Sequence, residues 1–250
     1  MAAFDVFFSY RRHDLAKAQP LLDALAEAGV RVWRDERDIP DQASITDEIR
    51  HGIADSKAFL AFYSLTYPIS NPCEQEITAA WLAAEQMSDT AHGRVWILNP
   101  EGSFDHLPEL LRDRQSRLSI RDASQLAETV LAIKDRLSAL DSTLLGSGVR
   151  GLPAYYGMTP IQATRFVGRA RELWDLHGHI TANRRSIISG VYGQAAAQVR
   201  GLGGNGKSLL AREYSIRFGP AYPGGVFWLN AYGNDDTKGP LKPGTAPRPA

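Results

Sequence analysis

The sequence has little of three features that often assign a protein to a class: cysteine, an excess of one charge, and long apolar runs. Cys73 is the single cysteine among 250 residues, which excludes an internal disulfide and a multi-cysteine metal site. The 28 basic and 28 acidic side chains cancel, with no Lys/Arg-rich block, so neither nucleic acid nor an anionic membrane is an expected partner. No apolar run is long enough to span a bilayer, and residues 1–10 lack the basic start of a signal peptide. We therefore expect a soluble cytoplasmic protein.

What is present is an alternation of short apolar runs with segments of helical pattern. The β-prone runs occupy residues 4–10, 30–33, 58–64 and 94–99, and the last amphipathic helix of this region carries Leu126, Val130, Ile133 and Leu137. Such alternation predicts a doubly wound α/β fold with a parallel sheet, whose site lies at the carboxyl ends of the strands. We expect this domain to span residues 1–141.

The segment from Asn71 to Trp81 contains the strongest candidate for a functional residue. It follows the apolar run 58–64, and its Ala, Leu and Glu content predicts a helix that begins at Cys73 and has Glu76 in its first turn. The helix macrodipole favours an ionised carboxylate there, facing the open end of the sheet. From this segment alone two interpretations stay open. Glu76 is either a functional anion or, like Glu74, an ordinary acid that stabilises a helix start.

Three of these segments resemble the Toll/interleukin-1 receptor (TIR) family. Residues 4–11 (FDVFFSYR) are similar to its opening box, and residues 30–40 to its second strand and the loop that follows. The pattern Cys73-x-x-Glu76 is similar to the strand-to-helix site of bacterial and plant TIR enzymes, although Pro72 stands where many of them have Trp. The resemblance covers residues 4–140 and implies a flavodoxin-like doubly wound sheet.

The resemblance also implies an activity, hydrolysis of NAD⁺ to nicotinamide and ADP-ribose or a cyclic form, with Glu76 as the catalytic residue. Nicotinamide leaves as a neutral molecule, so a single carboxylate that stabilises the oxocarbenium-like ribose is sufficient, and no metal is needed in this domain. Candidate NAD-binding residues stand at the ends of the first two predicted strands: Ser9, Tyr10, Arg11 and Trp33. Aromatic rings would stack on the bases and Arg11 would meet a phosphate. Each residue also has a simpler structural explanation when it is considered alone. Trp33 is then a core residue, and Arg11 is a solvated residue at the end of a loop.

In TIR proteins, self-association involves the loop that corresponds here to Arg37 to Ala43. The resemblance therefore implies that a neighbouring molecule completes the active site, that activity depends on assembly, and that a protein trigger controls it. The alternative is a non-enzymatic TIR scaffold that signals by homotypic association through the same loop.

A second motif occurs in the C-terminal half, after a linker expected at 142–164. Residues 201–208 (GLGGNGKS) fit the P-loop pattern through Gly201, Gly203, Gly204, Gly206, Lys207 and Ser208. Backbone N–H groups of such a loop bind the phosphates of ATP or ADP, Lys207 reaches the terminal phosphates, and Ser208 is a candidate Mg²⁺ ligand. With a helix after 165 and strands expected at 195–199 and 224–230, the segment 165–232 resembles the start of an NB-ARC/STAND ATPase module. Such modules adjoin TIR domains in bacterial anti-phage and plant immune proteins.

We expect this module to be incomplete as an ATPase. Phosphoryl transfer also requires an acidic residue at the end of another apolar strand. Asp235 and Asp236 are the only late acids, and they lie near the start of a Gly/Pro-rich tail, 233–250, that is typical of disorder. We therefore expect a nucleotide-binding segment without appreciable ATP hydrolysis, and we disfavour a third interpretation, an ATPase in its own right.

Overall fold

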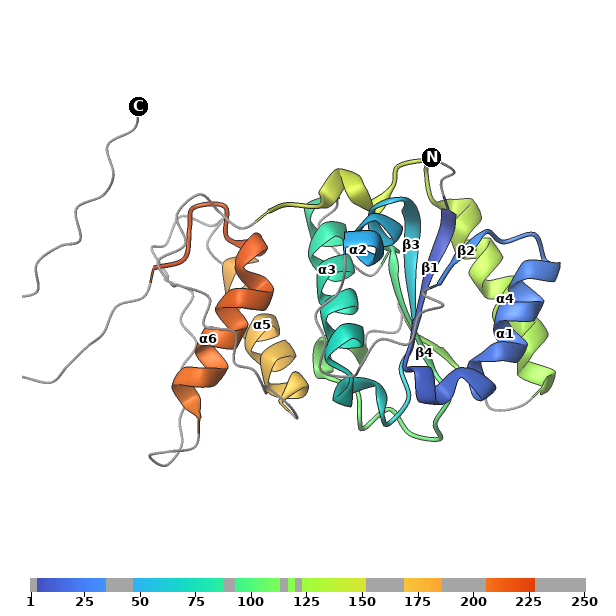
Figure 1. Ribbon diagram of the computed structural model, residues 1–250, viewed down its shortest axis with the longest axis horizontal. Helices are drawn as coiled ribbons and strands as arrows, with labels where there is room; N and C mark the ends of the chain where they lie inside the picture. The colour runs from blue at the N-terminus through green and yellow to red at the C-terminus, as the bar shows by residue number, and fades with distance from the viewer. Residues whose placement is uncertain are drawn as a thin grey trace, which may run out of the picture.

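The computed structural model (Figure 1) describes seven stretches of the chain: residues 4–34, 47–87, 93–112, 117–119, 123–151, 169–185 and 206–227. Within them, five strands form one sheet in the order β2-β1-β3-β4-β5, and every pairing is parallel. Their bounds are β1 (Phe4–Tyr10), β2 (Val32–Trp33), β3 (Ser56–Phe62), β4 (Val95–Asn99) and β5 (Arg117–Ser119). This is the flavodoxin-like doubly wound order, which confirms the predicted parallel α/β sheet. The short edge strand β5 was not predicted.

Helices cover both faces of the sheet (Figure 1), and their bounds are α1 (Leu15–Glu27), α2 (Asp47–Ala54), α3 (Asn71–Met87) and α4 (Ala123–Ala139). Alternate residues of β1 divide between the faces, as the period of a strand requires. Val6 and Phe8 pack in one core with α1 and α4, whereas Phe7 packs in the other core with α2 and α3. Ser9 follows Phe7 on the α3 side, and this register brings it to the site.

Two further helices, α5 (Ala170–Arg185) and α6 (Lys207–Phe218), pack beside α3 on its side away from the sheet (Figure 1). Leu173, Trp174, Leu210 and Phe218 belong to the same buried cluster as Trp81 and Ile77 of α3. The helix predicted after residue 165 is therefore present. Its apolar face and that of α6 extend the core that α2 and α3 form on the sheet.

The first residues of the predicted linker also pack on this domain. A short 3₁₀ turn, η5 (Leu145–Gly148), lies against α3 and α2 with Leu145 fully buried. A Cβ atom on Gly148 would stand 1.9 Å from the carbonyl oxygen of Ala83, a backbone atom of α3. Only glycine allows this close approach. The ordered chain of the first domain thus continues past residue 141.

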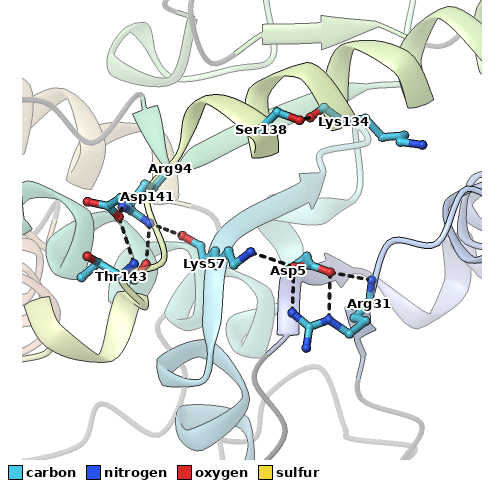
Figure 2. A network of polar contacts seen from close by, with 8 residues as sticks. All are labelled: Asp5, Arg31, Lys57, Arg94, Lys134, Ser138, Asp141 and Thr143. Atoms are coloured by element: carbon cyan, nitrogen blue, oxygen red, sulfur yellow. Dashed lines mark hydrogen bonds and ion pairs between the residues drawn. The ribbon is translucent and has the colours of Figure 1, made fainter.

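A polar network ties the amino ends of the strands together, as Figure 2 shows. Arg94 donates to the carbonyl oxygens of Lys57 at 2.9 Å and Thr143 at 2.7 Å, and it pairs with Asp141. It therefore fixes the chain that leaves α4 against the sheet. The second part of the network is the carboxylate of Asp5, which pairs with Arg31 at 3.0 Å and with Lys57 at 3.1 Å.

The Asp5 contacts make stability depend on pH. The hydrogen bond from Arg31 is the largest cause that lowers the pKa of Asp5 from 3.8 to about 2. Because the folded pKa is depressed, the stabilisation is present above about pH 4 and is lost as the pH falls toward 2. We expect Asp5→Asn to lower the free energy of unfolding at pH 7 by about 1 kcal/mol, since exposure of Arg31 weakens the pair.

Urea unfolding of Asp5→Asn and wild type at several pH values between 7 and 2 measures this effect. The difference should shrink to near zero at the acid end. Glu27→Gln, which removes an exposed acid at the end of α1, is the matched control and should change stability little at any pH. A difference for Asp5→Asn that does not depend on pH would contradict the ion-pair explanation.

Candidate active site

The carboxylate of Glu76 lies on α3, close to the carboxyl end of β1. The Ser9 hydroxyl, near the last residue of β1, donates to Glu76 Oε2 over 2.6 Å. Ser9 is 2% exposed and Glu76 is 7% exposed, so the bond is shielded from bulk water. A short hydrogen bond to an ionised carboxylate is among the stronger ones in proteins. The sequence placed both residues at this edge of the sheet, and the structure brings them together.

The helix that carries Glu76 starts earlier than expected. α3 begins at Asn71 rather than Cys73, and its first intrahelical bond runs from the Glu74 amide to the carbonyl oxygen of Ser70 at 3.1 Å. Pro72 does not end a loop here, because proline fits the first turn of a helix, where its missing N–H is not needed. Glu74 therefore occupies the first turn and Glu76 the second. The first-turn position predicted for Glu76 is wrong, and the bond from Ser9 joins it to β1 from the second turn.

A tyrosine outside the predicted site completes the polar group around Ser9. Tyr67, in the 3₁₀ turn η2 (Tyr67–Ile69) after β3, is fully buried, and its hydroxyl lies 2.7 Å from Ser9 Oγ. It also donates to the carbonyl oxygen of Cys73 over 3.1 Å. The only local sign of this role in the sequence is an aromatic residue before Pro68, between β3 and α3.

Trp33 lies on the same face of the sheet, at the end of β2. Its ring stacks on that of Phe7 with a centroid distance of 4.5 Å, and it covers Gly52, where a Cβ would stand 2.4 Å from the indole. Trp33 is partly exposed. Core packing thus accounts for one side of the ring, and its part in binding NAD⁺ stays a prediction.

The structure places Tyr10 and Arg11 differently from Ser9. Tyr10 packs with Phe8, at a ring distance of 5.7 Å, in the core formed by α1 and α4 on the opposite face of the sheet. Arg11 is half-buried at the exit from β1, with extended backbone before the turn η1 (Arg12–Asp14). Consecutive residues of a strand point to opposite faces, which is why Ser9 and Tyr10 do not meet the same neighbours.

A second buried carboxylate stands beside the first. Glu74 accepts hydrogen bonds from the Tyr63 hydroxyl at 3.3 Å and from Trp174 Nε1 at 3.2 Å, and burial raises its pKa. Arg217 of α6 favours the charged form of Glu74 and donates to Asn71 Oδ1 over 2.8 Å. Sequence reasoning did not anticipate these contacts, because their partners are distant in the chain. They fasten α5 and α6 to the first turn of α3.

Cys73 is adjacent to both carboxylates without being a nucleophile. It is 4% exposed, and burial, together with the nearby Glu76, raises its pKa well above the ordinary value. Its thiol therefore stays protonated, and attack requires the thiolate. In the described stretches no group of three or more His, Cys, Asp and Glu side chains is arranged to hold a metal ion. The helices of those stretches also include none that is long and apolar enough to cross a membrane.

The P-loop motif is described only at its end. Gly201, Gly203 and Gly204 lie outside the described residues, as do the loop Arg37 to Ala43 predicted for self-association, the predicted strand 195–199 and the predicted tail 233–250. Gly206 has a φ of 69°, which favours glycine, and α6 begins directly after it with Lys207 and Ser208. Over 224–227 only Val226 is paired, as an isolated bridge, so the described part of the strand predicted at 224–230 is not formed.

Comparison with known proteins identifies the family. The TIR domain family matches residues 6–131, half of the chain, and this chain belongs to it. A solved structure of the TIR domains of the activated Roq1 resistosome, described as directly recognising the pathogen effector XopQ, is 19% identical in sequence. That similarity covers 54% of this chain and 84% of the other, with a TM-score of 0.35. No curated protein matches the chain.

Proposed function

We propose that this TIR domain hydrolyses NAD⁺ at the bond between nicotinamide and ribose, with Glu76 as the catalytic carboxylate. The observation that carries the proposal is the position of Glu76, held by Ser9 at the carboxyl end of β1. Open parallel α/β sheets bind their ligands at this edge. The family resemblance of the Cys73-x-x-Glu76 segment supports the same assignment.

The chemistry requires little beyond one well-placed anion. Breaking the C1′–N bond releases neutral nicotinamide and leaves positive charge on the ribose, and water then adds to C1′ and loses a proton to give ADP-ribose. A carboxylate fixed beside C1′ stabilises the developing cation without reorganisation. Capture by a group of the substrate itself would give a cyclic product.

We further propose that the domain works in an assembled state, through the loop Arg37 to Ala43, in immune-type signalling started by a protein trigger. Trp33 and Arg11 are the proposed contacts to the dinucleotide at the end of the sheet. Binding of ATP or ADP with Mg²⁺ at residues 201–208 is a separate prediction that this chemistry does not require.

One observation favours the alternative, a TIR scaffold without activity. The Ser9 hydroxyl already satisfies Glu76 Oε2, as expected for a buried acid with a purely structural role. In that case the domain signals by self-association alone.

Incubation of the purified chain with NAD⁺ at low and high protein concentration, with nicotinamide measured by chromatography, separates the two functions. We expect the rate per molecule to rise with protein concentration, because assembly completes the site. Folded protein at high concentration that releases no nicotinamide would favour the scaffold.

A further inference from the structure

Two buried tyrosines lie side by side next to α3, and each is linked by hydrogen bonds to a different carboxylate. Tyr63 and Tyr67 are both fully buried, with ring centroids 4.6 Å apart. The hydroxyl of Tyr63 donates to Glu74 Oε1, whereas that of Tyr67 lies against Ser9 Oγ, which donates to Glu76. The two tyrosines therefore have the same side chain and similar burial but different hydrogen-bond partners.

Counting protons gives the chain of hydrogen bonds a direction. Ser9 has one hydroxyl proton, and an ionised Glu76 only accepts, so that proton lies in the 2.6 Å bond to Oε2. The 2.7 Å contact between Ser9 and Tyr67 then requires Tyr67 as its donor. The longer contact to the carbonyl oxygen of Cys73, at 3.1 Å, shares the same phenolic proton. Protons thus point from Tyr67 through Ser9 to Glu76.

Tyr67 keeps the proton that it donates to Ser9. Burial raises the pKa of Tyr67 well above 10, and the neighbouring Cys73 and Glu76 raise it further, so the phenol keeps its proton. Polarised chains of this kind strengthen each bond in them. The described titratable groups that act on Tyr67 also include Glu74 of α3, and Arg217 of α6 acts on Glu74 in turn.

We propose that Tyr67 is a positioning residue for Glu76: through Ser9 it fixes Oε2 and stabilises the carboxylate as an anion. The inference rests on the proposed NAD⁺ hydrolysis, in which Glu76 faces the ribose. Tyr67 itself does not reach the substrate, because it is fully buried behind Ser9. Its loss affects the reactivity of a bound substrate more than the binding itself.

Tyr67→Phe removes only the hydroxyl group that begins the chain, and Tyr63→Phe is the matched control. We expect Tyr67→Phe to lower kcat about 10-fold with KM within about twofold, a smaller loss than for a donor that touches the reacting atoms. Tyr63→Phe loses an equally buried hydroxyl, so it should share the cost in stability and keep kcat within about twofold of wild type. Equal kcat values for the two variants would overturn the inference.

A double-mutant cycle on unfolding tests the coupling without any activity. The effects of Tyr67→Phe and Glu76→Ala on the urea midpoint should be non-additive, because Glu76→Ala removes the acceptor at the end of the chain, whereas those of Tyr63→Phe and Glu76→Ala should add. If wild type releases no nicotinamide, the proposed function fails, and this cycle still decides the coupling. Additive effects for Tyr67 and Glu76 would then overturn it, and non-additive effects would uphold it.

Discussion

Glu76→Gln is expected to abolish NAD⁺ cleavage, with a fall in kcat of at least about 10²-fold. Glutamine has nearly the same shape, and its amide oxygen accepts the bond from Ser9 that the carboxylate accepts in wild type. It has no charge to stabilise the oxocarbenium-like ribose. The variant therefore separates the charge of Glu76 from its packing, which Glu76→Ala does not do.

Glu74→Gln is the control, because it removes a neighbouring buried carboxylate on the same helix. Glu74 accepts from Tyr63 and Trp174, and burial raises its pKa toward the neutral form, so an amide is a close substitute. We expect the variant to keep kcat within about fivefold of wild type. Initial rates of nicotinamide release, with circular dichroism to confirm folding, measure both variants. Equal losses in both would show that the site does not distinguish the two acids and would contradict the role given to Glu76.

The fold could be predicted because its main strands are local apolar runs. The runs at 4–10, 58–64 and 94–99 have no polar interruption that repeats with period two, as expected of strands covered on both faces, and they form β1, β3 and β4. The edge strand β5 was missed because it has three residues, of which Leu118 is described as buried. Such a short strand has no periodicity to detect in the sequence. It forms as a strand because it pairs with β4.

Of the site, the sequence predicts only the residues that stand in recognisable motifs. Ser9 and Glu76 stand in segments that resemble the family, whereas Tyr67 has no role that spacing or composition reveals. Tyr10 was grouped with Ser9 because the two are adjacent in sequence, but a strand turns adjacent side chains to opposite faces. The contact between Glu74 and Trp174 joins residues 100 positions apart, and only the folded chain shows it.

The contact between Glu74 and Trp174 also bears on how the C-terminal half of the chain is interpreted. From the sequence, residues 165–232 read as the start of a separate nucleotide-binding module. Among the described residues, most of the buried apolar side chains of α5 and α6 belong to the cluster that includes Trp81 and Ile77 of α3. His177 of α5 adds a partly buried contact to Glu85 of α3, at 3.3 Å. The helix that carries Glu76 is thus held between the sheet on one side and this helix pair on the other.

Trp174→Ala is expected to cause the largest loss of stability, about 4 kcal/mol in the free energy of unfolding. The indole is 1% exposed and packs edge-on against Trp81 at 5.5 Å and Phe218 at 5.4 Å. The substitution leaves a cavity between α3, α5 and α6 and removes a donor from the buried Glu74. For a chain of this size the loss corresponds to a fall in Tm of about 10 °C. Because the core is shared, wild type should unfold in one transition that the variant shifts as a whole.

Scanning calorimetry, with tryptophan fluorescence as a second probe, measures the effect. Glu172→Ala, at an exposed position of the same helix, should leave Tm within about 2 °C and controls for changes in helix propensity. If wild type melts in two steps and Trp174→Ala lowers only one of them, α5 and α6 form a unit that α3 does not need. A single transition that moves for Trp174→Ala alone would instead mean that the helix pair stabilises the helix of the candidate active site. A change in α5 or α6 would then act directly on α3.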